Sequence, residues 1–223
     1  MASYRVLIVL LILNLSLIAK ELPEGFVYIK EQIPNIEIAL RYNTTDNFLG
    51  KRVDGYHSNR AILSIEATKA LKRVQKELNR FGLGLKIFDS YRPQKAVDNF
   101  VRWAKDLNDT LKKDKYYPTV DKKNLFRDGY IASKSGHSRG STLDLTIIDL
   151  ETKTELDMGS GFDFFGKKSW VLYQDIIPQQ RANRMLLHTI MIKNGFKSYA
   201  QEWWHFTLKD EPYPNRYFDF EIE

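Results

Sequence analysis

The 223-residue sequence contains no cysteine, and this absence removes several kinds of chemistry. Without thiols the chain has no disulfide, no thiolate metal ligand and no cysteine nucleophile. Histidine is also scarce, with four residues, so a metal site built from imidazoles has few candidate ligands. The sequence has no internal repeat and no low-complexity linker. These absences favour one globular domain, and a chain of this length can bury a sizeable core.

The sequence also lacks any long block of one charge. Its formal net charge is +6, but the 34 lysines and arginines are interspersed with 28 acidic residues. Runs such as Lys112-Lys113-Asp114-Lys115 are interrupted by acid and are typical of solvated loops. We therefore expect no nucleic-acid partner. No pattern indicates the oligomeric state, which is left open.

Apolar runs long enough to span a membrane are missing as well. The one extended run, Val6 to Ala19, is shorter than the roughly 20 residues that a spanning helix needs. With Arg5 before it, this run has the pattern of a signal peptide over residues 1–19, although Leu17 is large for a cleavage site after Ala19. We predict an exported protein of the periplasm or cell envelope, with no stable membrane span after signal cleavage. The alternatives are a buried N-terminal helix or strand and a cytoplasmic location.

The remaining residues, 20–223, are predicted to form a single domain. Ser64 to Phe81 has apolar residues at the three- and four-residue spacing of one helical face, with Ser64 as N-cap and Gly82 beyond the end. Because helices and strands do not alternate regularly, we predict an α+β fold, a mainly antiparallel sheet packed with helices. Further helices are predicted over 93–107 and 178–194, strands over 85–89, 141–149, 196–199 and 203–208, and a polar excursion over 108–130.

Two of the four histidines lie close to acidic residues in unusual surroundings. His137 is in a turn-rich segment before the strand that carries Asp144, and an aspartate flanked by leucines is unfavourable to bury unless it is paired or binds a metal. His205 follows Glu202 and two tryptophans. Two imidazoles and one carboxylate are a ligand set of catalytic zinc, which leaves one position for water. His137, Asp144 and His205 are therefore candidate ligands in a zinc site at the sheet, with Glu202 as general base.

The spacing alone leaves a plainer interpretation open, because a single histidine is more often a core or surface residue than a ligand. Residues three apart also point to opposite faces of a regular strand. Glu202 and His205 converge only if the backbone turns or bulges at the two tryptophans. His57 is interpreted as a surface residue, and His188, in an amphipathic segment, as structural.

An ordered set of motifs from about residue 42 to the C-terminus resembles the D-alanyl-D-alanine dipeptidases of the vancomycin-resistance type. These belong to a zinc peptidase superfamily that also contains D,D-carboxypeptidases. The motifs are Tyr42 with Asp46-Asn47-Phe48 and Gly50, Asp89 to Pro93, Ser135 to Thr146, Met158 to Phe164, Glu202 to His205, and Asp210 to Asn215.

The resemblance implies one Zn²⁺ per chain and assigns its surroundings. His137, Asp144 and His205 match the zinc ligands of the family. Glu202 matches the catalytic base. The metal set suggested by the residue types and the set implied by the resemblance are therefore the same.

The resemblance also implies residues that contact the substrate. Arg92 matches the arginine that stabilises the oxyanion of the tetrahedral intermediate, and Asp89 matches the carboxylate that holds this arginine. Asp163 matches a carboxylate that binds the free ammonium of the dipeptide, with Tyr42 nearby. Ser135 matches a hydroxyl close to the substrate.

The predicted function is zinc-dependent hydrolysis of the dipeptide D-Ala-D-Ala to two D-alanines, in cell-wall peptide recycling or in precursor depletion. One alternative is a D,D-carboxypeptidase or endopeptidase that acts on longer wall peptides. Another is a non-catalytic binding module on the same scaffold. The presence of both Glu202 and Arg92 argues against the binding module, because binding alone needs neither a base nor an oxyanion cation.

Overall fold

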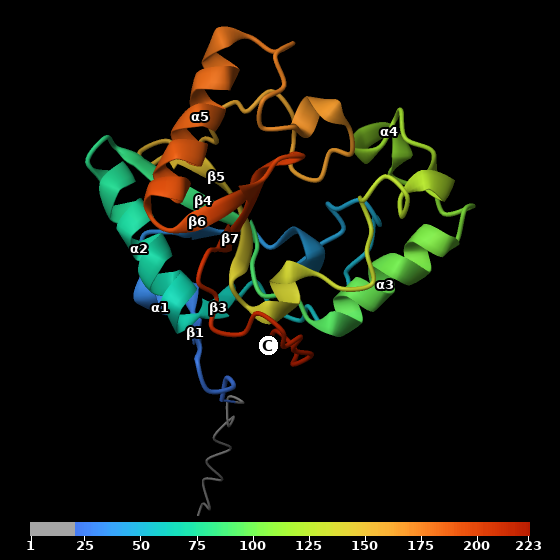
Figure 1. Cartoon of the computed structure of the whole chain (residues 1–223), viewed down its shortest axis with the longest axis horizontal. Coiled ribbons are helices and arrows are strands. Elements are labelled where there is room, and N and C mark those ends of the chain that lie inside the picture. Colours follow the sequence, from blue (N-terminus) through green and yellow to red (C-terminus); the bar gives the residue numbers. More distant parts are fainter. Residues whose placement is uncertain (1–20) are drawn as a thin grey trace, which may run out of the picture.

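Residues 21–223 are described by a computed structural model (Figure 1), and the predicted signal segment, 1–19, lies outside them. In this described part, no helix combines the length and the apolar character needed to cross a membrane. The strands are β1 (Phe26–Tyr28), β2 (Glu37–Ile38), β3 (Ile62–Ser64), β4 (Leu83–Asp89), β5 (Thr142–Asp149), β6 (Phe196–Tyr199) and β7 (Glu202–Leu208). The helices are α1 (Ile29–Gln32), α2 (Ile65–Asn79), α3 (Gln94–Lys105), α4 (Lys113–Tyr116) and α5 (Pro178–Lys193), with short 3-10 turns η1 (Arg41–Asn43), η2 (Lys122–Asn124), η3 (Gly136–Arg139) and η4 (Lys167–Ser169).

A five-stranded sheet in the order β2-β4-β5-β7-β6 forms the centre of the fold, and β1 pairs with β3 in a separate two-stranded sheet. The predicted α+β class is confirmed, but the prediction of a mainly antiparallel sheet is corrected to a mixed sheet. The edge strand β2 runs parallel to β4, while the other three pairings are antiparallel. The two residues of β2 are too few to show an alternation pattern, and the crossover through α2 gives β4 the same direction.

Helix α2 begins where its sequence signal predicts. Ser64 is the N-cap, and its hydroxyl accepts a hydrogen bond from the amide of Ala67 (3.3 Å), which satisfies one free donor of the first turn. The helix ends at Asn79, two residues earlier than predicted, and Phe81 is 74% exposed instead of packed on the apolar face. Gly82 then reverses the chain with a φ of 70°, a conformation that suits glycine.

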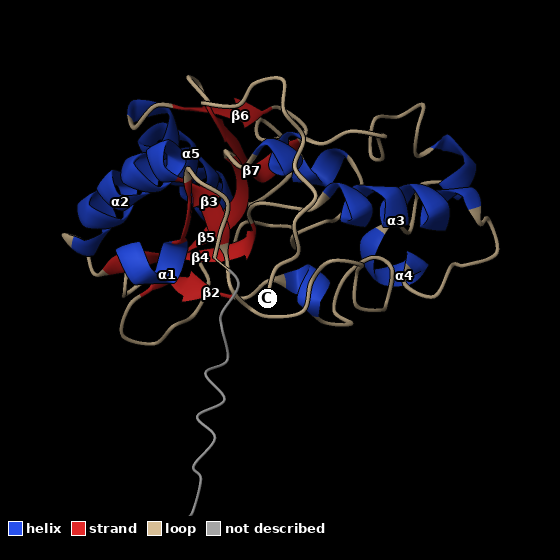
Figure 2. Cartoon of the chain, turned by 90° about the horizontal axis from the view of Figure 1, so that it is seen from below, coloured by secondary structure: helices blue, strands red, loops and turns tan. Residues whose placement is uncertain are grey.

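The helices leave one side of the sheet for the functional side chains. In both views α2 and α5 lie together on one side of the sheet, and α3 and α4 lie on the other (Figures 1 and 2). Helix α2 contacts β4, and α5 contacts β6 and β7. The predicted polar excursion, 108–130, carries α4 and η2 on the side of α3. A space between the sheet and α3 is therefore available for a site.

Candidate active site

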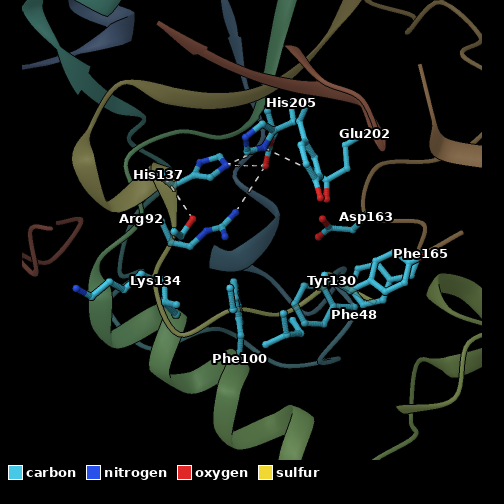
Figure 3. Close-up of a pocket in the computed structure, with 18 of the residues that line it drawn as sticks. Phe48, Arg92, Phe100, Tyr130, Lys134, His137, Asp163, Phe165, Glu202 and His205 are labelled. Carbon is cyan, nitrogen blue, oxygen red and sulfur yellow. Dashed lines mark hydrogen bonds and ion pairs between the residues drawn. The ribbon is translucent and has the colours of Figure 1, made fainter. Parts of the chain in front are cut away.

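Three neighbouring strands and one turn bring the central groups together. Asp89 of β4 lies opposite Asp144 of β5, and Asp144 lies opposite His205 of β7. Directly opposed residues of antiparallel strands project from the same face of the sheet. His137 comes from η3, and Gly140 (φ 80°) turns the chain from η3 into β5. Figure 3 shows the two imidazoles meeting on the same side of the cleft.

The facing atoms of His137, Asp144 and His205 have separations that suit a tetrahedral zinc ion. His137 Nε2 lies 3.4 Å from His205 Nδ1 and 3.4 Å from Asp144 Oδ2, and His205 Nδ1 lies 3.0 Å from Asp144 Oδ1. Zinc bonds of about 2.0–2.2 Å place tetrahedral ligand atoms roughly 3.3–3.6 Å apart, a range that two of these separations meet and the third falls just short of. Asp144 Oδ1 is buried, with His205 Nδ1 3.0 Å away but no well-formed hydrogen bond among the described residues, so its lone pairs are available to a cation. These three residues form a group that can hold one metal ion.

Burial and neighbouring charges set the protonation of this group. His137 Nδ1 lies 2.8 Å from the carbonyl of Ser90, which can only accept, so Nδ1 carries the proton and Nε2 is left for a metal. Burial lowers the pKa of His137, which keeps its imidazole neutral. Burial also lowers the pKa of His205, but Asp144 and Glu202 raise it more, so the net shift is upward. Burial raises the pKa of Asp144, and the two imidazoles lower it further than that, so Asp144 is ionised.

The convergence of Glu202 and His205 requires a turn or bulge near the tryptophans, and β7 has such a bulge. The register of β6 and β7 shifts between the pairs Ser198–Phe206 and Tyr199–Glu202, and the intervening residues of β7 form the bulge. Glu202 Oε2 lies 3.4 Å from His205 Nδ1, and the Glu202 side chain is 26% exposed. Burial raises the pKa of Glu202 to about 7, with His205 opposing the rise. A carboxylate that titrates near neutral pH suits proton transfer.

Arg92 follows β4 and makes the predicted contact with Asp89. Its Nε and Nη2 each lie 2.8 Å from Asp89 Oδ2, and Nη2 lies 3.6 Å from Asp144 Oδ2. The hydroxyl of Tyr56 donates to Asp89 Oδ1 at 2.6 Å. Burial raises the pKa of Asp89, and Arg92 opposes this rise. Tyr56 was not predicted as part of the site, because it lies far from Asp89 in the sequence and belongs to no motif.

Asp163 and Glu202 present their carboxylates to the same part of the cleft, on the side opposite Arg92 (Figure 3). Asp163 has a φ of 59°, a left-handed conformation that aspartate tolerates better than most residues. Its Oδ2 accepts a hydrogen bond from the hydroxyl of Tyr42 (2.8 Å). Burial, and next the charge of Asp144, raise the pKa of Asp163 well above its usual range. The ionised form of such a buried carboxylate becomes favourable when a ligand places a cation next to it.

A cleft of about 330 Å³ collects eight of the nine predicted site residues, and Asp89 lies buried against Arg92. Ser135 is among them, and its hydroxyl accepts the amide hydrogen of His137 (3.3 Å). The wall opposite the imidazoles is aromatic (Figure 3). This wall was not predicted, because its residues come from distant segments and none has a sequence pattern that indicates a place in the site. It consists of Phe48, Phe100, Tyr130 and Phe165.

The two other histidines do not line the cleft, in agreement with their interpretation from the sequence. His57 is exposed, and its Nε2 lies 3.6 Å from Glu221 Oε2. His188 lies on α5, where its Nε2 contacts the Ser198 hydroxyl at 3.1 Å.

The arrangement of a metal-binding group, an adjacent base and a fixed cation in one cleft is that of a metallopeptidase. Residues 23–223 match the peptidase family described as D-ala-D-ala dipeptidase, and the chain belongs to this family. A D-alanyl-D-alanine dipeptidase of Enterococcus faecalis is 44% identical over 198 residues, which cover 89% of this chain and 98% of that protein. One of Streptomyces coelicolor is 44% identical over 88% of this chain and 98% of that protein.

Among solved structures, a vancomycin-resistance D,D-pentapeptidase, VanY, in complex with Zn(II) aligns with 68% of this chain and 75% of that chain. The sequence identity is 13% and the TM-score is 0.42, a similarity too low to bear on fold or function.

The pKa shifts of the two histidines lead to an expected pH dependence of metal binding. A metal ion must displace a proton from His205, whose pKa is raised, but none from His137 or Asp144. Metal affinity should therefore be level above the pKa of His205 and fall about tenfold per pH unit below it. Competition titrations against a chromophoric chelator, from about pH 5 to about pH 8, measure this curve. His188→Ala is the control that should leave the curve unchanged, and a pH-independent affinity of the unmodified protein would contradict the assignment.

Proposed function

We propose that the chain is a zinc-dependent dipeptidase that hydrolyses the peptide bond of D-alanyl-D-alanine and releases two D-alanines. The observation that carries this proposal is one cleft in which a metal-binding group lies near a buried carboxylate that has no cationic partner among the described residues. The group is His137, Asp144 and His205, and the carboxylate is Asp163. Membership of the D-ala-D-ala dipeptidase family supports both the reaction and the substrate.

Zinc suits the two imidazoles and one carboxylate of the metal-binding group, and when bound it supplies Lewis acidity toward water and the scissile carbonyl. Contacts within the protein orient the ligands of this group in the absence of an ion. The carbonyl of Ser90 fixes the tautomer and the ring orientation of His137. The pairing of β5 with β7 fixes Asp144 beside His205.

Glu202 and Arg92 divide the remaining chemistry between them. The Glu202 carboxylate takes a proton from the attacking water and delivers it to the leaving amine, and a pKa of about 7 allows both transfers near neutral pH. The Arg92 guanidinium faces the negative charge that develops on the carbonyl oxygen. Because Asp89 already holds Arg92 in place, the cation needs no reorganisation during the reaction.

Asp163 makes the cleft selective for a free dipeptide. The ammonium of D-Ala-D-Ala binds the Asp163 carboxylate, whose position is fixed by the hydrogen bond from Tyr42. Ser135 supplies a hydroxyl on the lining of the same cleft. A longer peptide would place a neutral amide at Asp163 and leave this buried carboxylate without a counter-charge, which is strongly unfavourable.

Replacing Glu202 should separate metal binding from turnover. Glu202→Gln keeps the shape of the side chain but removes the base, so we expect kcat to fall about 10²- to 10⁴-fold while metal content stays the same. Metal analysis and steady-state kinetics with D-Ala-D-Ala measure the two properties. Glu151→Gln, at an exposed glutamate, should leave both unchanged. Retention of more than about a tenth of kcat in Glu202→Gln would exclude this residue as the base.

Replacing Asp163 should reveal which end of the substrate it binds. Asp163→Asn removes the charge with a residue that also tolerates a positive φ, so we expect kcat/KM for D-Ala-D-Ala to fall about 10- to 100-fold. The unmodified enzyme should cleave N-acetyl-D-Ala-D-Ala and a wall pentapeptide poorly. Product analysis with these three substrates makes the comparison. If the blocked or longer substrates were cleaved as well as the free dipeptide, a D,D-carboxypeptidase would replace the dipeptidase.

We also propose that the protein is exported to the periplasm or cell envelope and acts in cell-wall recycling. Support comes from the apolar run Val6 to Ala19 behind Arg5, and the family match begins only at residue 23. An exported enzyme would meet dipeptides released from the wall, whereas a cytoplasmic enzyme would meet the precursor pool.

Cell fractionation tests the location. The full-length chain should be recovered outside the cytoplasm, because the apolar run directs its export. A version that starts at Lys20 should stay inside. Equal cytoplasmic recovery of the two forms would exclude export and favour precursor depletion.

A further inference from the structure

The segment that carries Asp163 has little regular structure of its own. Between Asp149, which ends β5, and Pro178, which begins α5, every residue is described, and the short turn η4 is the one helical element. Asp163 itself adopts a φ of 59°, which L side chains rarely do. A binding group has to be held within about 0.5 Å of its productive position. Other parts of the fold must therefore hold this segment.

Arg184, on α5, holds both ends of residues 158–170, the part of this connection that carries Asp163 and is called the segment from here on. Its side chain is buried, at 1% exposed, and it does not line the cleft. Nε donates to the carbonyl of Met158 (2.6 Å), Nη1 to that of Trp170 (2.8 Å) and Nη2 to that of Lys168 (2.8 Å). The fixed fork of a guanidinium can satisfy three carbonyls in this way, whereas an ammonium on a flexible stem cannot reproduce the geometry.

A chain of side-chain hydrogen bonds continues from Arg184 into the middle of the segment. Ser160 Oγ accepts from Arg184 Nη2 (3.4 Å) and from Trp203 Nε1 (3.0 Å). Ser169 Oγ lies 3.2 Å from Ser160 Oγ and donates to the carbonyl of Phe164 (2.6 Å). Because that carbonyl only accepts, Ser169 has no proton left, and Ser160 must donate to Ser169. Each hydroxyl in the chain therefore has a defined direction.

The two ends of this network are next in sequence to two residues whose carboxylates line the cleft, Asp163 and Glu202. Phe164 follows Asp163, and Trp203 follows Glu202. We propose that Arg184 is a positioning residue for substrate binding, which fixes segment 158–170 so that Asp163 lies where the dipeptide ammonium binds. This inference rests on the proposed dipeptidase function and adds to it a residue outside the cleft that sets substrate affinity.

Arg184→Lys tests the proposal with the positive charge retained. The contact between Asp163 and the ammonium exists before and during the reaction, so its displacement should raise KM for D-Ala-D-Ala about tenfold and change kcat less than about threefold. Zinc content should not change. The matched control is Arg181→Lys on the same helix, whose guanidinium donates to the carbonyls of Gln174 (3.1 Å) and Ile176 (2.6 Å), outside residues 158–170. Arg181→Lys should leave KM unchanged.

A second variant and a double-mutant cycle separate positioning from general stability. Ser169→Ala removes one buried hydroxyl that bonds the carbonyl of Phe164, and it should also raise KM. If Arg184→Lys does not fold, Ser169→Ala alone tests whether the network positions Asp163. In the Asp163→Asn background, either change should alter kcat/KM less than about twofold, because the residue to be positioned no longer binds the ammonium. Thermal unfolding of each variant shows whether it is folded at the assay temperature.

The possible results are distinguishable. An unchanged KM in folded Arg184→Lys and Ser169→Ala would overturn the positioning role. The role would also be overturned if these changes lowered kcat/KM by the same factor in the wild-type and in the Asp163→Asn background. If the wild type cleaves D-Ala-D-Ala and Asp163→Asn leaves kcat/KM unchanged, the ammonium site and this inference are overturned together. No cleavage of D-Ala-D-Ala by the zinc-loaded wild type would overturn the proposed function, and the inference would fall with it.

Discussion

Charge balance in the cleft is the constraint on which the rest of the site depends. Asp144, Asp163 and Glu202 line one small cleft, and the nearest guanidinium, Arg92, is already paired with Asp89. Burial raises the pKa values of Asp163 and Glu202, and the charge of Asp144 raises both further, because neighbouring carboxylates resist ionising together. A divalent ion and an ammonium would together match the charge of these three carboxylates. The protein is thus electrostatically complementary to its loaded state.

The metal ion and the substrate ammonium would bind to parts of the fold that are held in place in different ways. The metal-binding group lies on paired strands and on a turn whose imidazole is fixed by a backbone carbonyl. Asp163, the proposed ammonium site, lies on a connection that is hydrogen-bonded to α5 and to the bulged strand β7. The metal end is therefore built into the sheet, whereas the substrate end depends on side-chain hydrogen bonds that cross between elements. Substitutions remote from the cleft should act mainly on the substrate end.

The sequence alone predicted the local parts of this structure and the residues with unusual chemistry. Ser64 marks the start of a helix by its capping chemistry, and Asp144 is conspicuous because a carboxylate between leucines needs a partner. Other features depend on contacts between distant segments, which no local pattern records. The parallel direction of β2, the hydrogen bond from Tyr56 to Asp89, and the bonds made by Arg184 are of this kind. Such contacts are fixed by tertiary packing, and sequence reasoning without an alignment does not reach them.

The direct pairing of Asp144 with His205 has a consequence for folding. A slip of one residue between β5 and β7 would turn one of these side chains to the opposite face, against α2 and α5, and would bring a large apolar neighbour to the cleft in its place. An ion that needs both ligands binds the correct pairing alone, and it stabilises that state by mass action. The site therefore acts as a check on strand alignment, because chains with misaligned strands gain nothing from the metal.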